Sequence, residues 1–82
     1  MARRYEYLVE DLSTRETGAF ATMSAARSFA KSRSIATGHV VAILAVDTRD
    51  GSRYAQGAYY GRRWEGGTHH YTSRDRLFTR RR

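Results

Sequence analysis

Arginine and aromatic residues are concentrated in the last thirty residues of this chain. From Arg53 to Arg82 there are eight arginines and two acidic residues, whereas residues 1–52 hold seven basic and six acidic side chains. The same segment carries the aromatic residues Tyr54, Tyr59, Tyr60, Trp64, Tyr71 and Phe78. Guanidinium groups pair with phosphate or carboxylate and stack on planar rings, and aromatic rings stack on nucleobases. This chemistry indicates binding to a nucleic acid, a nucleoprotein or an acidic protein surface.

The densest candidate binding segment is Tyr59-Tyr60-Gly61-Arg62-Arg63-Trp64. Two guanidinium groups on a glycine turn between aromatic residues would bring charge and stacking together. A structural interpretation also stands, in which the arginines are solvated and Trp64 fills the core. The candidate binding residues of the whole chain are Arg53, Tyr54, Tyr59, Tyr60, Arg62, Arg63, Trp64, His69, Tyr71, Arg74 and Arg76.

The adjacent histidines His69 and His70 are the candidates for catalysis. Neighbouring residues of a strand point to opposite faces, so this pair is poorly placed to bind one metal ion. One histidine could instead move the proton of a ribose 2′-hydroxyl in a metal-free ribonuclease. The segment Gly67 to Tyr71 resembles the glycine-hydroxyl-histidine strand of HicA-type toxin ribonucleases, although in that family the strand directly follows the first helix. We expect a histidine that lines a binding surface, a protein that is not an enzyme, and no cofactor.

The composition is that of one small domain. The chain has 82 residues, a net charge of +7 and no cysteine, so disulfides and thiolate metal sites are excluded. Its longest apolar run, Val40 to Val46, has the length of a strand and is far too short to span a membrane. The first residues lack an apolar segment of the signal-peptide type. We expect a cytoplasmic protein of a bacterial host cell, with no membrane partner.

The first half of the sequence predicts two strands and a helix. Residues 4–12 alternate like a strand, with Tyr5, Tyr7 and Val9 on one face. A hairpin loop is expected over 13–18 and a short returning strand over 19–21. A helix is predicted over about 23–36, capped by Thr22 and ended by Gly38. Its expected apolar stripe contains Ala25, Phe29 and Ala36, with Ala26 and Ala30 beside them.

The second half predicts further strands. Apolar residues on both faces make 39–47 a central strand, and Asp50-Gly51 is a hairpin signal before a partner strand over 53–60. After a turn at 61–63, a short edge strand is expected over 68–72 and a helical turn over 73–78. Residues 79–82 read as a frayed basic tail.

The predicted fold class is therefore α+β, a single domain in which one main helix packs on an antiparallel sheet of three to five strands. One helix leaves the second face of the sheet open as a binding surface. Small Ala55 and Gly57 are expected under the helix. Tyr54, Gln56 and Tyr60 would then point outward on the open face.

This layout resembles the small anti-CRISPR inhibitors of type I systems that have one helix on a bent antiparallel sheet. The matching features span roughly residues 4–64: the tyrosine strand, the alanine-arginine helix 25–31, the apolar strand 40–46, the Asp50-Gly51 hairpin and the tyrosine strand that leads to Trp64. The resemblance implies a non-catalytic phage protein that binds a host CRISPR surveillance complex and blocks recruitment of target DNA. Many such inhibitors are acidic DNA mimics, and this chain is basic, so it would bind an acidic patch or the nucleic-acid path itself.

A second hypothesis is a free-standing nucleic-acid-binding module that uses the same arginines on phosphate and the tyrosines as stacking platforms. The charge asymmetry fits both hypotheses and does not separate them. The chain is expected to be a monomer, or a homodimer that pairs open faces or edge strands.

Overall fold

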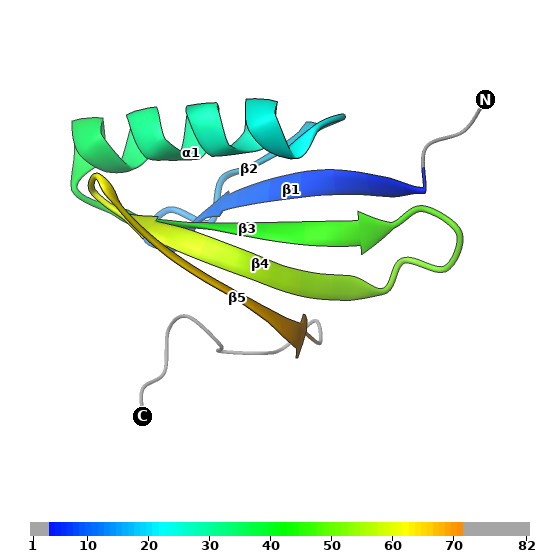
Figure 1. Ribbon diagram of the computed structural model, residues 1–82. Coiled ribbons are helices and arrows are strands. Elements are labelled where there is room, and N and C mark those ends of the chain that lie inside the picture. The colour runs from blue at the N-terminus through cyan, green and yellow to red at the C-terminus, as the bar shows by residue number, and fades with distance from the viewer. Residues whose placement is uncertain (1–3, 72–82) are drawn as a thin grey trace.

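Five antiparallel strands form one sheet, and a single helix packs on one of its faces (Figure 1). The computed structural model describes residues 4–71, with side chains described as far as Gly66. The elements are β1 (Tyr5–Asp11), β2 (Thr17–Phe20), α1 (Met23–Thr37), β3 (Val40–Asp47), β4 (Arg53–Tyr60) and β5 (Arg63–Tyr71). Across the sheet the strands run in the order β2-β1-β3-β4-β5, so the apolar β3 is central, as predicted. The α+β fold class is confirmed.

The helix begins and ends where the sequence predicts. The Thr22 hydroxyl accepts a hydrogen bond from the Ala25 amide at 3.1 Å, and Gly38 adopts the left-handed conformation with φ of 76°. The Gly38 amide donates to the carbonyl of Ser34, which satisfies one of the last carbonyls of the helix.

The predicted apolar stripe of α1 is confirmed for Ala26 and Ala30, but the buried face is rotated about the helix axis from the predicted centre of the stripe. The buried residues are Ala26, Ala30 and Ser34, spaced four apart, whereas Ala25 and Ala36 are exposed and Phe29 is 42 % exposed. A buried serine is tolerated because its hydroxyl lies 2.7 Å from the His39 carbonyl, to which it donates, and 2.7 Å from the Gly61 amide, from which it accepts. Small side chains on this face let the helix approach the sheet closely.

The main core lies between α1 and the sheet. Val9, Val41, Ile43 and Tyr59 meet the two helix alanines there. The partly buried side chains of Tyr7, Phe20, Met23 and Trp64 pack around this cluster.

The face away from the helix is not the open surface that the sequence predicts. Leu44 is 1 % exposed and forms a second small buried cluster with Ala55, against which Leu8 packs. Ala42 and Ala58 are also buried. The middle of this face is therefore closed to solvent, and a binding surface has to be sought elsewhere.

A bulge in β4 reverses the predicted faces of Tyr54 and Ala55, whereas Tyr60 points away from the helix, as predicted. Ile43 pairs with Gly57 but Leu44 pairs with Ala55, which leaves Gln56 as an extra residue in the ladder. Gly57 lies on the helix side, as expected, whereas Ala55 lies on the opposite face with Leu44. On the other side of the bulge, the alternation of side chains between the two faces is shifted by one residue. Tyr54 therefore points to the helix side of the sheet.

The last strand is longer than predicted. β5 runs continuously over Arg63–Tyr71 and pairs with β4 along its length, in place of a loop and a short strand over 68–72. The register shifts between Ala55 and Gly57, so β5 follows the bulge. The expected helical turn at 73–78 and tail at 79–82 lie outside the described residues.

One further connection differs from the prediction, and one confirms it. β2 begins at Thr17, where a loop was expected, because residues 17–20 pair with β1. The Asp50-Gly51 hairpin is confirmed, because β3 and β4 pair directly and Gly51 has a positive φ of 78°. It lies in the five-residue connection 48–52, in which the Gly51 amide donates to the Asp47 carbonyl at 2.7 Å.

Candidate binding groove

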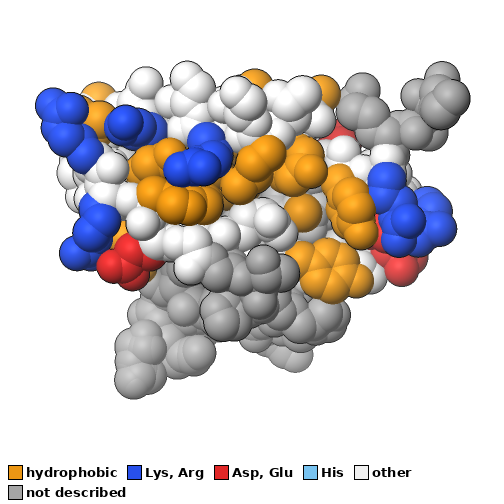
Figure 2. Space-filling model, in the orientation of Figure 1, with side chains coloured by type: hydrophobic (Ala, Val, Ile, Leu, Met, Phe, Trp, Pro, Cys, Tyr) orange, Lys and Arg blue, Asp and Glu red, His pale blue; other side chains and the backbone are white. Residues whose placement is uncertain are grey.

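The helix covers only part of its face of the sheet. Strands β1, β3 and β4 extend beyond the N-terminal end of α1 (Figure 1). On this uncovered part lies a groove of about 350 Å³, which we call the tyrosine groove. Its described lining residues are Tyr5, Tyr7, Ala45, Tyr54 and Gln56. Figure 2 shows a band of hydrophobic side chains that begins below the helix and continues past it toward a group of basic side chains.

Strand alternation and the bulge together assemble this groove. Tyr5 and Tyr7 are two residues apart in β1, so they share a face. Ala45 pairs with Tyr7 on one side and with Tyr54 on the other, and its small side chain forms a floor between the two rings. Without the extra residue at Gln56, Tyr54 would point to the opposite face.

Two arginines and one carboxylate stand beside the groove. Arg4 Nε lies 3.2 Å from Asp47 Oδ2, and its guanidinium carbon lies 5.3 Å from the centre of the Tyr5 ring. Arg49 Nε lies 3.4 Å from Asp47 Oδ1. The arginine side chains are 54 % and 65 % exposed, so both remain accessible from solvent.

The carboxylate of this group stays ionised. The backbone amide of Arg49 donates to Asp47 at 2.9 Å and lowers its pKa, and the side chains of Arg49 and Arg4 lower it further. These effects outweigh burial, which raises the pKa, and bring it to about 2. At neutral pH two positive charges therefore share one negative charge, and the group keeps a net charge of +1.

The aromatic rings and the amide that line the groove, together with the exposed guanidinium groups beside it, are suited to binding. The rings can stack on a planar or apolar group, and the phenol hydroxyls can donate or accept hydrogen bonds. The guanidinium groups can bind a phosphate or carboxylate through two nitrogens. The groove thus suits a ligand with a flat part and an anionic part.

The segment Tyr59 to Trp64 does not form the single surface that the sequence suggested. Tyr59 is buried, and its ring centre lies 4.8 Å from that of Trp64 on the helix side. Arg27 of α1 covers both residues: its guanidinium carbon lies 4.3 Å from the Trp64 ring centre, and its Nε donates to the Tyr59 hydroxyl. Trp64 also lies against Gly57 and Gly66, so it is part of the packed structure and is not an open stacking platform.

The remaining members of that segment lie elsewhere. Tyr60 pairs with Arg63 and, by alternation with Tyr59, lies on the face away from the helix. The Arg63 guanidinium carbon is 5.1 Å from the Tyr60 ring centre, and its Nε is 3.2 Å from Glu65. Arg62 is exposed in the turn between β4 and β5.

Of the other predicted binding residues whose side chains the structure describes, only Tyr54 lines the groove. Arg53 pairs with Val46 and lies on the opposite face by alternation. By backbone register, His69 pairs with Ala55 and Tyr71 with Arg53, but their side chains lie outside the described part. The same holds for the His70 side chain, and Arg74 and Arg76 lie outside the described residues altogether.

The sequence reasoning missed the groove residues of the first half. The pattern places Tyr5 and Tyr7 on one strand face but assigns them no role, because they lie outside the arginine-rich half. The available signal was the pair of alternate tyrosines next to Arg4. No local signal marked Arg49, whose position depends on the 48–52 loop folding back against the start of β1.

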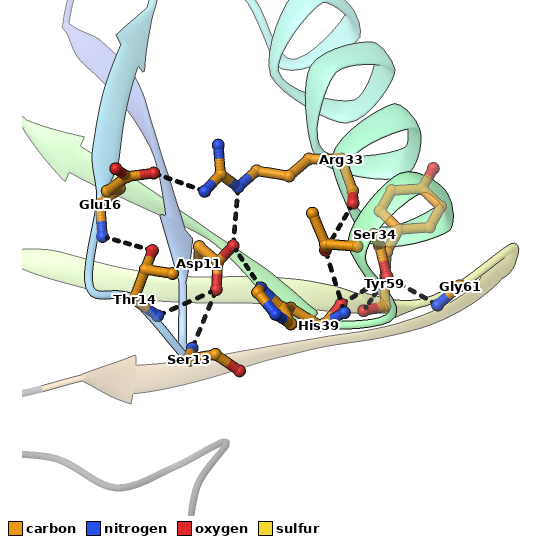
Figure 3. Close-up of polar contacts among 10 residues, drawn as sticks. Asp11, Ser13, Thr14, Glu16, Arg33, Ser34, His39, Tyr59 and Gly61 are labelled. Carbon is orange, nitrogen blue, oxygen red and sulfur yellow. Dashed lines mark hydrogen bonds and ion pairs between the residues drawn. The ribbon is translucent and has the colours of Figure 1, made fainter.

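A cluster of polar side chains around Asp11 lies at the other end of the sheet (Figure 3). The buried Asp11 carboxylate accepts hydrogen bonds from Arg33 Nε at 2.7 Å and from His39 Nδ1 at 2.9 Å, with the ring nitrogen as donor. It also accepts from the backbone amides of Ser13 and Thr14. Burial raises the pKa of Asp11, but the hydrogen bonds from His39, from Arg33 and from the two amides outweigh it and hold the pKa well below its usual range.

This cluster joins elements of the fold. Arg33 bridges to Glu16 as well as Asp11, so it links α1 to both ends of the β1–β2 loop. A hollow of about 330 Å³ lies beside it and is lined in part by Val9, Thr17 and Phe29. Because the carboxylates at this hollow are already bound by Arg33, we assign the cluster a structural role.

Among the described residues, no group of three or more histidine, aspartate or glutamate side chains is placed to hold a metal ion. Within residues 4–71 no helix is long and apolar enough to cross a membrane. No protein-family model, no curated protein and no solved structure matches this chain.

Proposed function

We propose that this protein acts by binding and not by catalysis, as an inhibitor that binds a host nucleoprotein complex through the tyrosine groove. The first complex to test is a type I CRISPR surveillance complex, the partner implied by the layout of one helix on an antiparallel sheet. The observation that carries the proposal is the groove itself, in which tyrosines stand beside two exposed arginines at an end of the sheet that the helix leaves uncovered.

The composition of the groove supports a binding role. Tyrosine and arginine are among the residues that contribute most to the energy of protein interfaces, especially where they surround a pocket. A truncated tyrosine or arginine at such a site typically costs about 2 kcal/mol or more of binding free energy. In the polar cluster at the opposite end of the sheet, the charged side chains are paired with one another within the fold. Few of these charges are therefore available to a partner.

Co-elution with the purified surveillance complex tests this proposal. We expect the wild-type protein to co-elute in size-exclusion chromatography and to reduce binding of target DNA. Arg49→Ala at the groove should weaken the association by at least about thirty-fold. Arg15→Ala is the matched control, because it removes the same charge from an exposed side chain that pairs with Glu10. Absence of co-elution, with unchanged DNA binding, would reject the proposed partner.

A free-standing nucleic-acid-binding module is the second candidate. Residues 4–66 contain nine basic and seven acidic side chains, a net of +2, so most of the charge of +7 belongs to the two ends of the chain. Basic chain ends of this kind give sequence-independent attraction to phosphate backbones. This candidate predicts duplex binding that falls steeply with salt, measured by fluorescence anisotropy. Duplex affinity that is insensitive to salt would contradict it.

A further inference from the structure

The tyrosine groove has features that point to one class of occupant. Tyr5 and Tyr7 are alternate residues of β1, and alternate strand residues are about 6.8 Å apart. A flat ring in contact on both of its faces needs roughly 7 Å between the flanking atoms. The backbone spacing of Tyr5 and Tyr7 is therefore comparable to the thickness of a single planar ring.

The charge beside the groove complements an anion close to that ring. Arg4 approaches both the Tyr5 ring and Asp47, while Arg49 approaches Asp47 from the 48–52 loop. Arg4 contacts Asp47 through Nε, and the long contacts of Arg49, at 3.4 Å and 3.5 Å, are weak. A phosphate between the two guanidinium groups would form stronger hydrogen bonds than these.

From this geometry we infer that the groove binds an unpaired nucleobase of a single-stranded nucleic acid, with the adjoining phosphate at Arg4 and Arg49. Every base can stack on aromatic side chains, so the site distinguishes a strand with bases from a strand without them, but does not distinguish one base from another. A duplex hides its bases between stacked neighbours and cannot place one in the groove. The inference rests on the proposal that the groove is the binding surface, and it names the part of the nucleoprotein that the groove holds.

The probes are labelled oligomers of about eight nucleotides, a length within the usual site size of such proteins. One is a thymidine DNA strand, one is a uridine RNA strand, and one is an abasic DNA strand with the same number of phosphates. Fluorescence anisotropy at near-physiological salt measures the affinity of each. We expect the thymidine and uridine strands to bind at least about ten-fold more tightly than the abasic strand.

Variants locate the site. Tyr5→Leu should remove most of the preference for strands that carry bases, and Arg49→Ala should weaken all three strands. Arg15→Ala removes an equal charge far from the groove and should change little, and a thermal melt of each variant confirms that it is folded. Equal affinity for base-bearing and abasic strands would overturn the inference, as would an unchanged preference in folded Tyr5→Leu or equal effects of the two arginine variants.

Different results would reject the proposed partner complex and the inferred nucleobase site. If the protein binds the surveillance complex but shows no preference for strands with bases, the inference is wrong and the groove contacts protein. If it prefers base-bearing strands through Tyr5 but does not bind the complex, the inference stands and the proposed partner is wrong.

Discussion

The Asp11 side chain shows how a single buried charge can organise a small fold. It is 1 % exposed and lies at the end of β1, where its two oxygens accept hydrogen bonds from α1, from the residue before β3 and from its own loop. A buried carboxylate is stable only when partners of this kind replace water. Asp11 thus fixes the position of the helix relative to the sheet.

Replacement of Asp11 by asparagine should destabilise the protein by about 3 kcal/mol, because Arg33 and His39 would lose their charged acceptor. Urea denaturation followed by circular dichroism measures this change at pH 7. Glu10→Gln is the control: Glu10 contacts Arg15, a pair whose arginine is 56 % exposed, and exposed pairs contribute less than about 1 kcal/mol. Equal stability of the Asp11→Asn variant and the wild-type protein would show that the cluster contributes nothing net.

Among the elements, β4 carries the most unusual backbone. Gly57 follows the bulge and has φ of 151°, which L side chains rarely adopt. A Cβ at this position would lie 2.6 Å from the Glu65 carbonyl oxygen and 2.7 Å from the Trp64 ring. The absence of a side chain at Gly57 is therefore what allows Trp64 to lie across the strand.

Gly57→Ala should lower the free energy of unfolding by at least about 2 kcal/mol, since backbone strain and overpacking act together. Gly18→Ala is the matched control, because its added Cβ would meet Phe20 at an ordinary 3.5 Å. Thermal and urea unfolding of both variants would check the difference. Similar stability of the two variants would mean that the strands shift easily to make room.

Some of these elements follow from local sequence signals, and others depend on contacts between distant parts of the chain. The sequence was sufficient for α1, because a threonine cap and a left-handed glycine are local signals. It was sufficient for the central position of β3, because apolar residues on both faces require cover on both sides. The faces of β4 could not be predicted, because a bulge at Gln56 depends on how two neighbouring strands pair. The groove depends on that bulge, and Tyr54 is the only predicted site residue with a described side chain that lines it.

On the scale of the whole molecule, stability should depend on pH in the acidic range. Asp11 and Asp47 both have pKa values below those of the unfolded chain, near 3.9. Groups of this kind stabilise the fold above the unfolded pKa and lose that contribution as the pH falls toward the folded pKa.

The melting temperature should therefore be nearly constant from about pH 8 to pH 5 and fall progressively below about pH 4. Differential scanning calorimetry across this range measures the effect. Asp11→Asn should flatten the acidic part of the curve, because one of the two groups is removed. A melting temperature that stays constant down to about pH 2 would contradict the assignment of these two carboxylates.

The position of Trp64 has a spectroscopic consequence. It is the only tryptophan of the chain, and it is held between two glycines of the sheet and the guanidinium group of α1. Its intrinsic fluorescence therefore reports on the packing of the helix against the sheet. Because Trp64 is absent from the described lining of the groove, its emission should follow unfolding and remain largely silent during binding. Tyrosine emission should respond to binding as well, because three of the six tyrosines line the groove, so a change in tyrosine emission without a change in Trp64 emission indicates occupation of the groove.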